Sequence, residues 1–175
     1  MLPNATMSLS AAGIRALKNY EAFRSKPYDD KTKKEWRPGT PLIGKLTVGY
    51  GRVLWNPAKD YEKYKNGVTE PQATQMLLED LRRFENSIRL NVEIPLSQNE
   101  YDATVIFIFN IGLGDPSKGI VGFVNSTFLK MLNQGNKLGA ANQLMRWVYS
   151  GGVFMQGLVN RRRKERTIFL TGKYA

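Results

Sequence analysis

The sequence predicts an α+β fold, with a small antiparallel sheet and a larger set of helices in separate parts of the chain. Glycines and prolines that interrupt any helix are concentrated in residues 23–60. Apolar residues recur at helical spacing before this segment and again from residue 69 onward. The length of 175 residues is typical of one domain. We therefore expect a single domain over residues 1–175, with a sheet lobe at about 23–65 and a helical lobe at 8–22 and 66–175.

The composition excludes several kinds of chemistry. The chain has no cysteine and no histidine, which rules out disulfides, thiol nucleophiles, Ser-His-Asp triads and Cys- or His-ligated metal sites. Acid–base catalysis would have to use carboxylates, lysine or tyrosine. The net charge is +11, and residues 116–175 hold ten basic groups against one acid, Glu165. This excess predicts a polyanionic partner: nucleic acid, an anionic membrane surface or an anionic wall polymer.

The first helix is expected to begin at a Ser8 or Ser10 cap and to end near residue 22. Ile14, Leu17 and Glu21 recur at i, i+3 and i+7, which places Glu21 on the apolar stripe. Glutamate is rarely buried unless it is paired. Glu21 is therefore either a functional carboxylate or a surface residue at a frayed helix end.

The remaining elements follow from turn and capping signals. Short strands are expected at residues 46–48 and 53–55, between the glycines and prolines. Later helices are expected where capping residues precede apolar periodicity. Their signals are the capping boxes Thr69–Gln72 and Ser97–Glu100, a cap at Asn125 or Ser126 for a short helix to Gly135, and helical segments at 137–149 and 156–170 on either side of a Gly151-Gly152 turn.

Two carboxylates point to acid–base chemistry. Glu21 and Asp30 lie nine residues apart, one at a helix end and one at the edge of the expected sheet. Two carboxylic groups in different surroundings, one protonated and one ionised, perform glycoside hydrolysis, although such a spacing also arises by chance. Thr47 precedes Gly49-Tyr50-Gly51. This strand end either lets a ligand approach the backbone beside a water-holding hydroxyl, or is a plain glycine bulge.

The order of these motifs resembles the active-site region of the phage lysozymes, which are the endolysins of glycoside hydrolase family 24. The resemblance covers roughly residues 9–173, and it rests on several short segments in the family's order rather than on any one of them. The segments are Tyr20-Glu21, Tyr28-Asp29-Asp30, Leu46-Thr47-Val48-Gly49-Tyr50-Gly51, Phe109-Asn110-Ile111-Gly112, Gly122-Phe123-Val124-Asn125-Ser126, Arg146-Trp147, Gly157-Leu158-Val159-Asn160-Arg161-Arg162 and Thr171-Gly172.

The resemblance implies a lysozyme-like fold with an active-site cleft between the two lobes. It implies that Glu21 is the catalytic general acid, that Asp30 steadies positive charge on the sugar or activates water, and that Thr47 positions this water. It also implies that Arg161 pairs with the catalytic glutamate. The position of Phe109 in an apolar helix favours simple core packing. The residues matched to substrate binding are Tyr50, Gly51, Phe109, Asn110, Gly112 and Arg161.

The chain departs from the family pattern at two places. Sixteen residues separate Asp30 from Thr47, more than in compact members of the family, so residues 31–44 are expected to lengthen the hairpin. This insertion leaves Asp29 as the alternative second carboxylate, and Glu35 within it is expected to be a solvated charge. Arg52 stands where the family usually has histidine, a difference that we interpret as structural.

We therefore expect an endolysin with muramidase activity, which hydrolyses the β-1,4 bond between N-acetylmuramic acid and N-acetylglucosamine in peptidoglycan without a metal or cofactor. A lytic transglycosylase would need only the glutamate, and the presence of Asp30 and Thr47 argues against it. A non-enzymatic basic protein that binds the wall or membrane is the other alternative. Such a protein would keep its activity when Glu21 is replaced by glutamine.

The sequence also supports expectations about partners and location. The longest apolar run, residues 104–109, is too short to span a bilayer, and no signal peptide is visible. We expect a monomer without a separate wall-binding domain, made in the host cytoplasm and released to periplasmic peptidoglycan by a holin. Nucleic acid is not expected as a partner. The basic run is either a solvated helix face or a surface attracted to the anionic cell envelope, through Arg161, Arg162, Arg163, Lys164 and Arg166.

Overall fold

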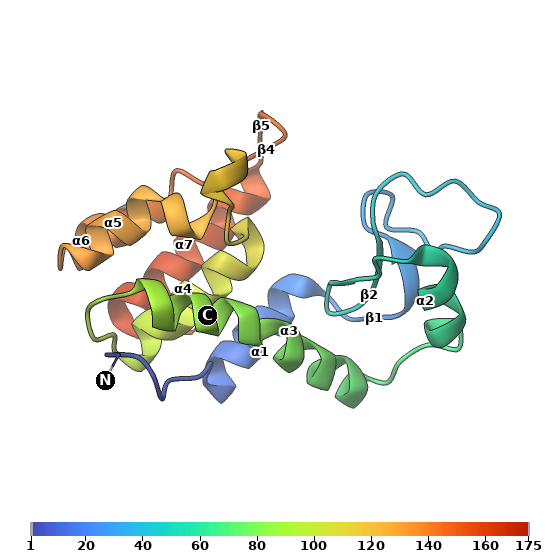
Figure 1. Ribbon diagram of the computed structural model, residues 1–175, viewed down its shortest axis with the longest axis horizontal. Helices are drawn as coiled ribbons and strands as arrows, with labels where there is room; N and C mark the ends of the chain where they lie inside the picture. Colours follow the sequence, from blue (N-terminus) through green and yellow to red (C-terminus); the bar gives the residue numbers. More distant parts are fainter. Residues whose placement is uncertain (1, 175) are drawn as a thin grey trace. The chain divides into compact units, whose positions relative to one another are not determined.

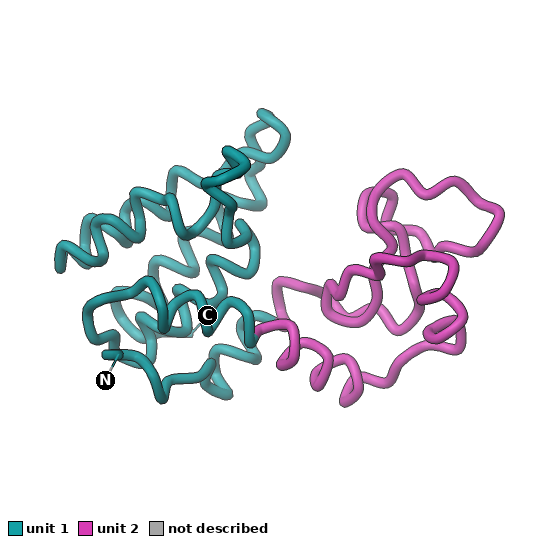
Figure 2. Tube along the Cα trace, viewed as in Figure 1, with its two compact units in different colours: residues 1–17, 82–175 teal, residues 18–81 magenta. Residues whose placement is uncertain are grey.

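A three-stranded antiparallel sheet and seven α-helices make up most of the computed structural model, which describes residues 2–174 (Figure 1). The chain divides into two units (Figure 2). Residues Lys18–Leu81 form one, called here the sheet unit, and residues 1–17 and 82–175 form the other, called the helical unit. The predicted combination of helices with a small antiparallel sheet is confirmed.

The sheet unit is built on strands β1 (Arg24–Asp29), β2 (Leu46–Gly49) and β3 (Arg52–Val53), in the order β1-β2-β3. Tyr28 lies opposite Thr47, and Thr47 lies opposite Val53. The strand predicted at residues 46–48 is confirmed, whereas the one predicted at 53–55 ends two residues earlier. The inserted residues 31–44 form an irregular loop between β1 and β2, visible in Figure 1.

The core of the sheet unit joins the sheet to the helices that follow it. Leu46, Val48, Leu54 and Met76 form a buried cluster. Helix α2 (Pro57–Tyr64) lies in the segment for which no helix was predicted. It begins because the Asn56 side chain accepts a hydrogen bond from the Lys59 amide and Pro57 occupies the first helical turn. Partly buried side chains that complete this core are Trp36, Leu42, Tyr61, Tyr64 and Val68.

The helical unit surrounds helix α4, whose residues Tyr101 to Ile108 are all buried, as its apolar sequence predicts. Helix α4 packs against α7, and α6 packs against both α5 and α7. Aromatic rings fill the space between them: the centroid of Phe107 lies 5.3 Å from that of Phe128 and 5.8 Å from that of Trp147. The elements are α4 (Gln98–Ile111), η1 (Pro116–Lys118), η2 (Phe123–Asn125), α5 (Thr127–Asn133), α6 (Lys137–Leu144), β4 (Tyr149–Ser150), β5 (Val153–Phe154) and α7 (Gln156–Thr171).

Two further helices, α1 (Ala11–Glu21) and α3 (Glu70–Asn91), each contribute residues to both units. The predicted caps are present. The Ser10 hydroxyl accepts from the Gly13 amide at 3.0 Å, and the Gln72 side chain accepts from the Thr69 amide at 2.8 Å. Glu100 likewise accepts from the Ser97 amide at 2.8 Å.

One predicted helix is too long. The helix expected at residues 137–149 ends at Leu144, and the chain then forms the β4–β5 hairpin. Gly151 and Gly152 have φ values of 56° and 79°, which a two-residue hairpin turn requires. Within the described residues, none of the helices combines the length and apolar character needed to cross a bilayer.

Candidate active site

Glu21, the final residue of α1, lies in the sheet unit beside the turn that follows β2. A Cβ atom on Gly51 would lie 3.6 Å from Oε2 of Glu21, and Gly51 has a φ of +89°. The carboxylate therefore rests against backbone that carries no side chain. The glycine pattern predicted either close approach of a ligand or a plain bulge, and the structure places the candidate acid against this glycine.

Asp30, Tyr28 and Thr47 are brought together by the register of β1 and β2. Tyr28 lies directly opposite Thr47, and directly opposed residues project from the same face of a sheet. Asp30 directly follows β1, and its amide donates to the carbonyl of Lys45, two residues before Thr47, at 3.0 Å. Burial raises the pKa of Tyr28; Arg24 opposes this shift, and the charges of Glu21 and Asp30 reinforce it.

Thr47 is suited to accept a hydrogen bond from water. Its side chain is buried, and its hydroxyl donates to the Lys45 carbonyl at 3.2 Å. This bond occupies the hydroxyl hydrogen and leaves the oxygen as an acceptor. A water that donates to Thr47 has its own lone pairs and its second hydrogen available for other partners.

Asp29 and Asp30 have different surroundings, which bear on the choice between them. Asp29 is buried and accepts backbone N–H groups from both ends of the inserted loop, at distances of 2.6 to 3.2 Å. Asp30 is half-exposed and accepts one backbone N–H, from Lys45 to Oδ1 at 2.7 Å. Asp29 therefore joins the two ends of the loop. Asp30 uses Oδ1 for the Lys45 amide, and its Oδ2 can face a substrate or water. The amides bound by Asp29 belong to Lys31, Thr32, Ile43 and Gly44.

The charge of Asp29 is expected to stabilise the loop in a pH-dependent way. Burial alone would raise the pKa of Asp29, but the backbone N–H groups favour the ionised form and lower it to about 2. Because the folded pKa lies below the usual 3.8, the stabilisation is complete above about pH 5 and is lost as the pH falls towards 2. Asp29→Asn is therefore expected to lower the melting temperature at neutral pH, with a difference from native that disappears near pH 2. An equal difference at every pH would contradict this role.

Gly44 is required by the two aspartates. A Cβ atom at this position would lie 2.0 Å from Oδ1 of Asp30 and 2.9 Å from Oδ1 of Asp29, too close for either carboxylate to stay in place. We expect Gly44→Ala to displace Asp30 and to lower peptidoglycan turnover by at least about tenfold, since small misplacements of catalytic groups are costly. Gly157→Ala is the matched control, because a Cβ there meets nothing within 4 Å. Turnover equal to that of the control would show that the loop adjusts without moving Asp30.

Hydrogen bonds between side chains hold the turn that follows β2, next to Glu21. The Tyr50 hydroxyl donates to Glu70 at 2.8 Å, and Lys18 donates to the same oxygen at 2.8 Å. The hydrogen bonds from Lys18 and Tyr50 lower the pKa of Glu70. Tyr50, predicted to contact substrate, thus has its hydroxyl committed to this network. Arg52 anchors β3 to α3 through Asp80 at 3.0 Å and through the Met76 carbonyl at 2.6 Å, a structural role like the one predicted.

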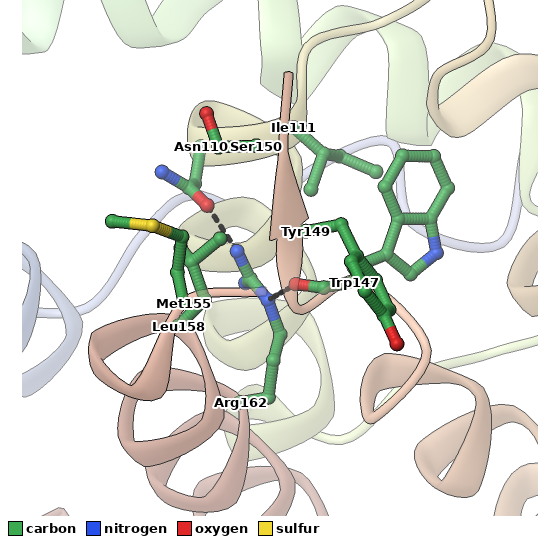
Figure 3. Close-up of a pocket in the computed structure, with 8 residues that line it drawn as sticks. All are labelled: Asn110, Ile111, Trp147, Tyr149, Ser150, Met155, Leu158 and Arg162. Atoms are coloured by element: carbon green, nitrogen blue, oxygen red, sulfur yellow. Dashed lines mark hydrogen bonds between the residues drawn. The ribbon is translucent and has the colours of Figure 1, made fainter. Parts of the chain in front are cut away.

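A second group of predicted site residues lies in the helical unit. Asn110 lines an open pocket of about 380 Å³ whose walls come from the end of α4, the β4–β5 hairpin and the start of α7 (Figure 3). The Arg162 guanidinium donates to Oδ1 of Asn110 and, at 3.0 Å, to the carbonyl of Trp147 (Figure 3). Arg162 therefore fixes the orientation of Asn110 at the pocket rim. The remaining lining residues are Ile111, Trp147, Tyr149, Ser150, Met155 and Leu158.

The other predicted contacts of this group have structural partners. Gly112 ends α4 with a φ of +83°, and its amide donates to Ile108 at 2.8 Å. The ring of half-buried Phe109 packs 5.3 Å from that of Phe84. Arg161 donates from Nε to Glu165 at 3.0 Å, so part of its guanidinium is held within its own helix.

The expected envelope-binding role of Arg162 is wrong. Its side chain is completely buried, as is that of Glu165, and the two form an ion pair. The sequence spacing indicated this burial. Val159, Arg162 and Phe169 recur at i, i+3 and i+10 on one helical face, and Glu165, the single acid of residues 116–175, lies between them. Arg163 and Lys164 are exposed, as the prediction of a basic face requires.

Comparisons with known proteins agree with this architecture. The family model described as phage lysozyme matches residues 18–165. The endolysin of Salmonella phage P22 is 36% identical over 166 residues, covering 94% of this chain and 99% of that protein. The endolysin of Bacillus phage B103 is 34% identical over 167 residues, covering 95% of this chain. The chain spans 56% of the length of this Bacillus phage relative.

A solved structure supports the same fold. The endolysin from Escherichia coli O157:H7 phage FAHEc1 superposes with a TM-score of 0.73 at 31% sequence identity. The match covers 97% of this chain and 98% of that one. Similarity of this extent includes both the strands and the helices described above.

Proposed function

Because the chain belongs to the phage lysozyme family, we propose that it is an endolysin with muramidase activity. The reaction is hydrolysis of the β-1,4 bond between N-acetylmuramic acid and N-acetylglucosamine in peptidoglycan. The observation that carries this proposal is the grouping of Glu21, Asp30 and Thr47 around β1 and β2 of the sheet unit. It supplies two carboxyl groups and a hydroxyl acceptor, which are the groups that glycoside hydrolysis needs.

Each of the three residues has a distinct role in the proposed mechanism. Glu21 donates its proton to the glycosidic oxygen as the bond to the leaving sugar breaks. Asp30, whose half-exposed carboxylate accepts the Lys45 amide, stabilises positive charge on the sugar or activates water. Thr47 accepts a hydrogen bond from this water through the lone pairs of its hydroxyl oxygen.

Further parts of the proposal concern binding and delivery. We propose that Asn110, held by Arg162, offers its amide to the substrate at the pocket of Figure 3. We also propose that the protein acts as a monomer and reaches periplasmic peptidoglycan through a holin. The exposed side chains of Arg163 and Lys164 would be attracted to the anionic envelope. The remaining proposed contacts with substrate are Tyr50, Gly51, Phe109, Gly112 and Arg161.

Mass spectrometry of the products released from purified peptidoglycan tests the proposed reaction. Muropeptides that end in an intact reducing muramic acid are expected, since water completes the cleavage. Products lighter by one water would contain an anhydro sugar, would identify a lytic transglycosylase and would contradict the roles of Asp30 and Thr47. Absence of products, with heat-treated protein as the background, would favour a non-enzymatic binding protein.

A further inference from the structure

We propose that the sheet unit has an anion-binding subsite next to the candidate active site, which binds a carboxylate of the peptide stem attached to muramic acid. The subsite is a pocket of about 170 Å³ lined by Arg24, Ser25, Lys26, Tyr28 and Glu35. Four of these residues belong to β1, and Glu35 belongs to the inserted loop. This inference rests on the proposed function, because it names a part of the substrate that the same site would recognise.

Tyr28 connects the pocket to the candidate catalytic carboxylates. Its side chain lines the pocket, its backbone lies opposite Thr47, and its hydroxyl feels the charges of Glu21 and Asp30. The pocket therefore lies along the strand that pairs with the strand of Thr47. A substituent of one of the two sugars joined by the bond is the part of the substrate nearest to these strands.

The charge around the pocket favours an anion. Residues 24–37 include six basic residues and three acids, a net charge of +3. Among the acids, Asp29 is surrounded by backbone N–H groups and Asp30 belongs to the catalytic pair. Glu35 lies 3.9 Å from Lys26 and 3.5 Å from Arg37, so its charge is shared between two cations.

Arg24 is placed to receive a carboxylate. Its guanidinium packs over the ring of Tyr28, 5.4 Å from the centroid, and one of its terminal nitrogens donates to the Lys33 carbonyl at 3.4 Å. These contacts hold the Arg24 guanidinium against the pocket wall and use only one of its five N–H donors. The other N–H donors of the planar guanidinium can bind a carboxylate in bidentate geometry.

The chemistry of the proposed substrate identifies which anion fits. The sugar units of the glycan strand carry N-acetyl and hydroxyl groups, and the free carboxylates belong to the peptide linked to muramic acid. The inserted loop builds the far wall, since Glu35 forms a β-bridge with Tyr28. The inserted loop thus closes one side of a pocket whose two cations, Arg24 and Lys26, come from β1.

Binding to soluble fragments tests the subsite independently of catalysis. The probes are a disaccharide-peptide and the same disaccharide-peptide with its carboxylates converted to amides, titrated into native protein and into Arg24→Gln/Lys26→Gln by calorimetry. Native protein is expected to bind the fragment with free carboxylates about tenfold more tightly, and the double variant is expected to lose this preference. Lys31→Gln/Lys34→Gln removes the same charge from the same segment outside the pocket and is expected to keep it. Equal binding of the two fragments by native protein would overturn the proposal.

Kinetics on two polymers then separates the subsite from the proposed function. On peptide-bearing peptidoglycan, Arg24→Gln/Lys26→Gln is expected to raise KM about tenfold with kcat unchanged. On peptidoglycan whose peptide carboxylates have been converted to amides, it is expected to match native protein. A rise in KM of equal size on both polymers would reject the peptide carboxylate as the ligand. Native protein that cleaves neither polymer would contradict the muramidase proposal, while the calorimetric result would still decide the subsite.

Discussion

Replacement of Glu21 by glutamine is expected to lower turnover of purified peptidoglycan by about a hundred- to ten-thousand-fold, the range for loss of a positioned general acid. Glutamine keeps the size of the side chain and its contact with the bare backbone of Gly51. It has no ionisable proton to give to the leaving sugar oxygen. The release of new reducing ends per minute, measured at saturating substrate, reports this loss directly.

Two comparisons make the Glu21 result specific. Glu62→Gln is the matched control, because Glu62 lies on the surface of α2 and pairs with Lys65. This control is expected to turn over substrate at the native rate. The assay is run well below the thermal unfolding midpoint of Glu21→Gln, so that the loss of turnover reports the chemistry and not unfolding. Turnover within about threefold of native would show that another group supplies the proton.

The local signals in the sequence predicted the elements whose ends are determined by neighbouring residues. Ser10, Thr69 and Ser97 each begin a helix because their hydrogen bonds span only three residues. The apolar pattern of residues 103–109 likewise predicted the buried helix α4 without any tertiary information. Capping and periodicity are therefore reliable where the stabilising contacts are local.

The errors combine a missed local signal with distant contacts. Helix α2 has a local signal that the prediction missed, the Asn56 cap followed by Pro57, and it is completed by the packing of Tyr61 and Tyr64 on the sheet core. The helix predicted at residues 137–149 stops at Leu144, and the following residues form a hairpin. Trp147 then packs on Phe107 and its carbonyl receives a bond from Arg162. Neither packing contact leaves a periodic pattern in the sequence.

The candidate site shows the same division between local and distant signals. The motifs singled out Glu21, Asp30 and Thr47, which the structure gathers in one unit. The motifs did not predict that Asp29 and Asp30 have different hydrogen-bond partners. The amides bound by Asp29 come from both ends of the inserted loop, which are distant from each other in the sequence. The placement of Tyr28 opposite Thr47 depends on strand register. A single sequence does not specify register across a long connection.

The buried ion pair of α7 leads to the largest expected effect on stability. Glu165 accepts from Nε of Arg161 at 3.0 Å and from the guanidinium of Arg162, and the side chains of Arg162 and Glu165 are both fully buried. Glu165→Gln places an amide N–H₂ against guanidinium donors and removes the negative charge from two cations. We expect a loss of about 3–5 kcal/mol in the free energy of unfolding of the helical unit, measured by urea denaturation.

The contrast with an exposed pair makes this prediction decisive. Glu62→Gln disrupts an i,i+3 pair on the surface and is expected to leave the urea midpoint almost unchanged. Replacement of both buried partners, in Arg162→Met/Glu165→Met, is expected to be milder than Glu165→Gln, since no charge then remains at either position. Because Arg162 also holds Asn110 and the Trp147 carbonyl, Glu165→Gln is further expected to loosen the pocket of Figure 3. If Glu165→Gln unfolds at the same urea concentration as Glu62→Gln, the ion pair does not stabilise the helical unit, and Arg162 is retained for its contact with Asn110.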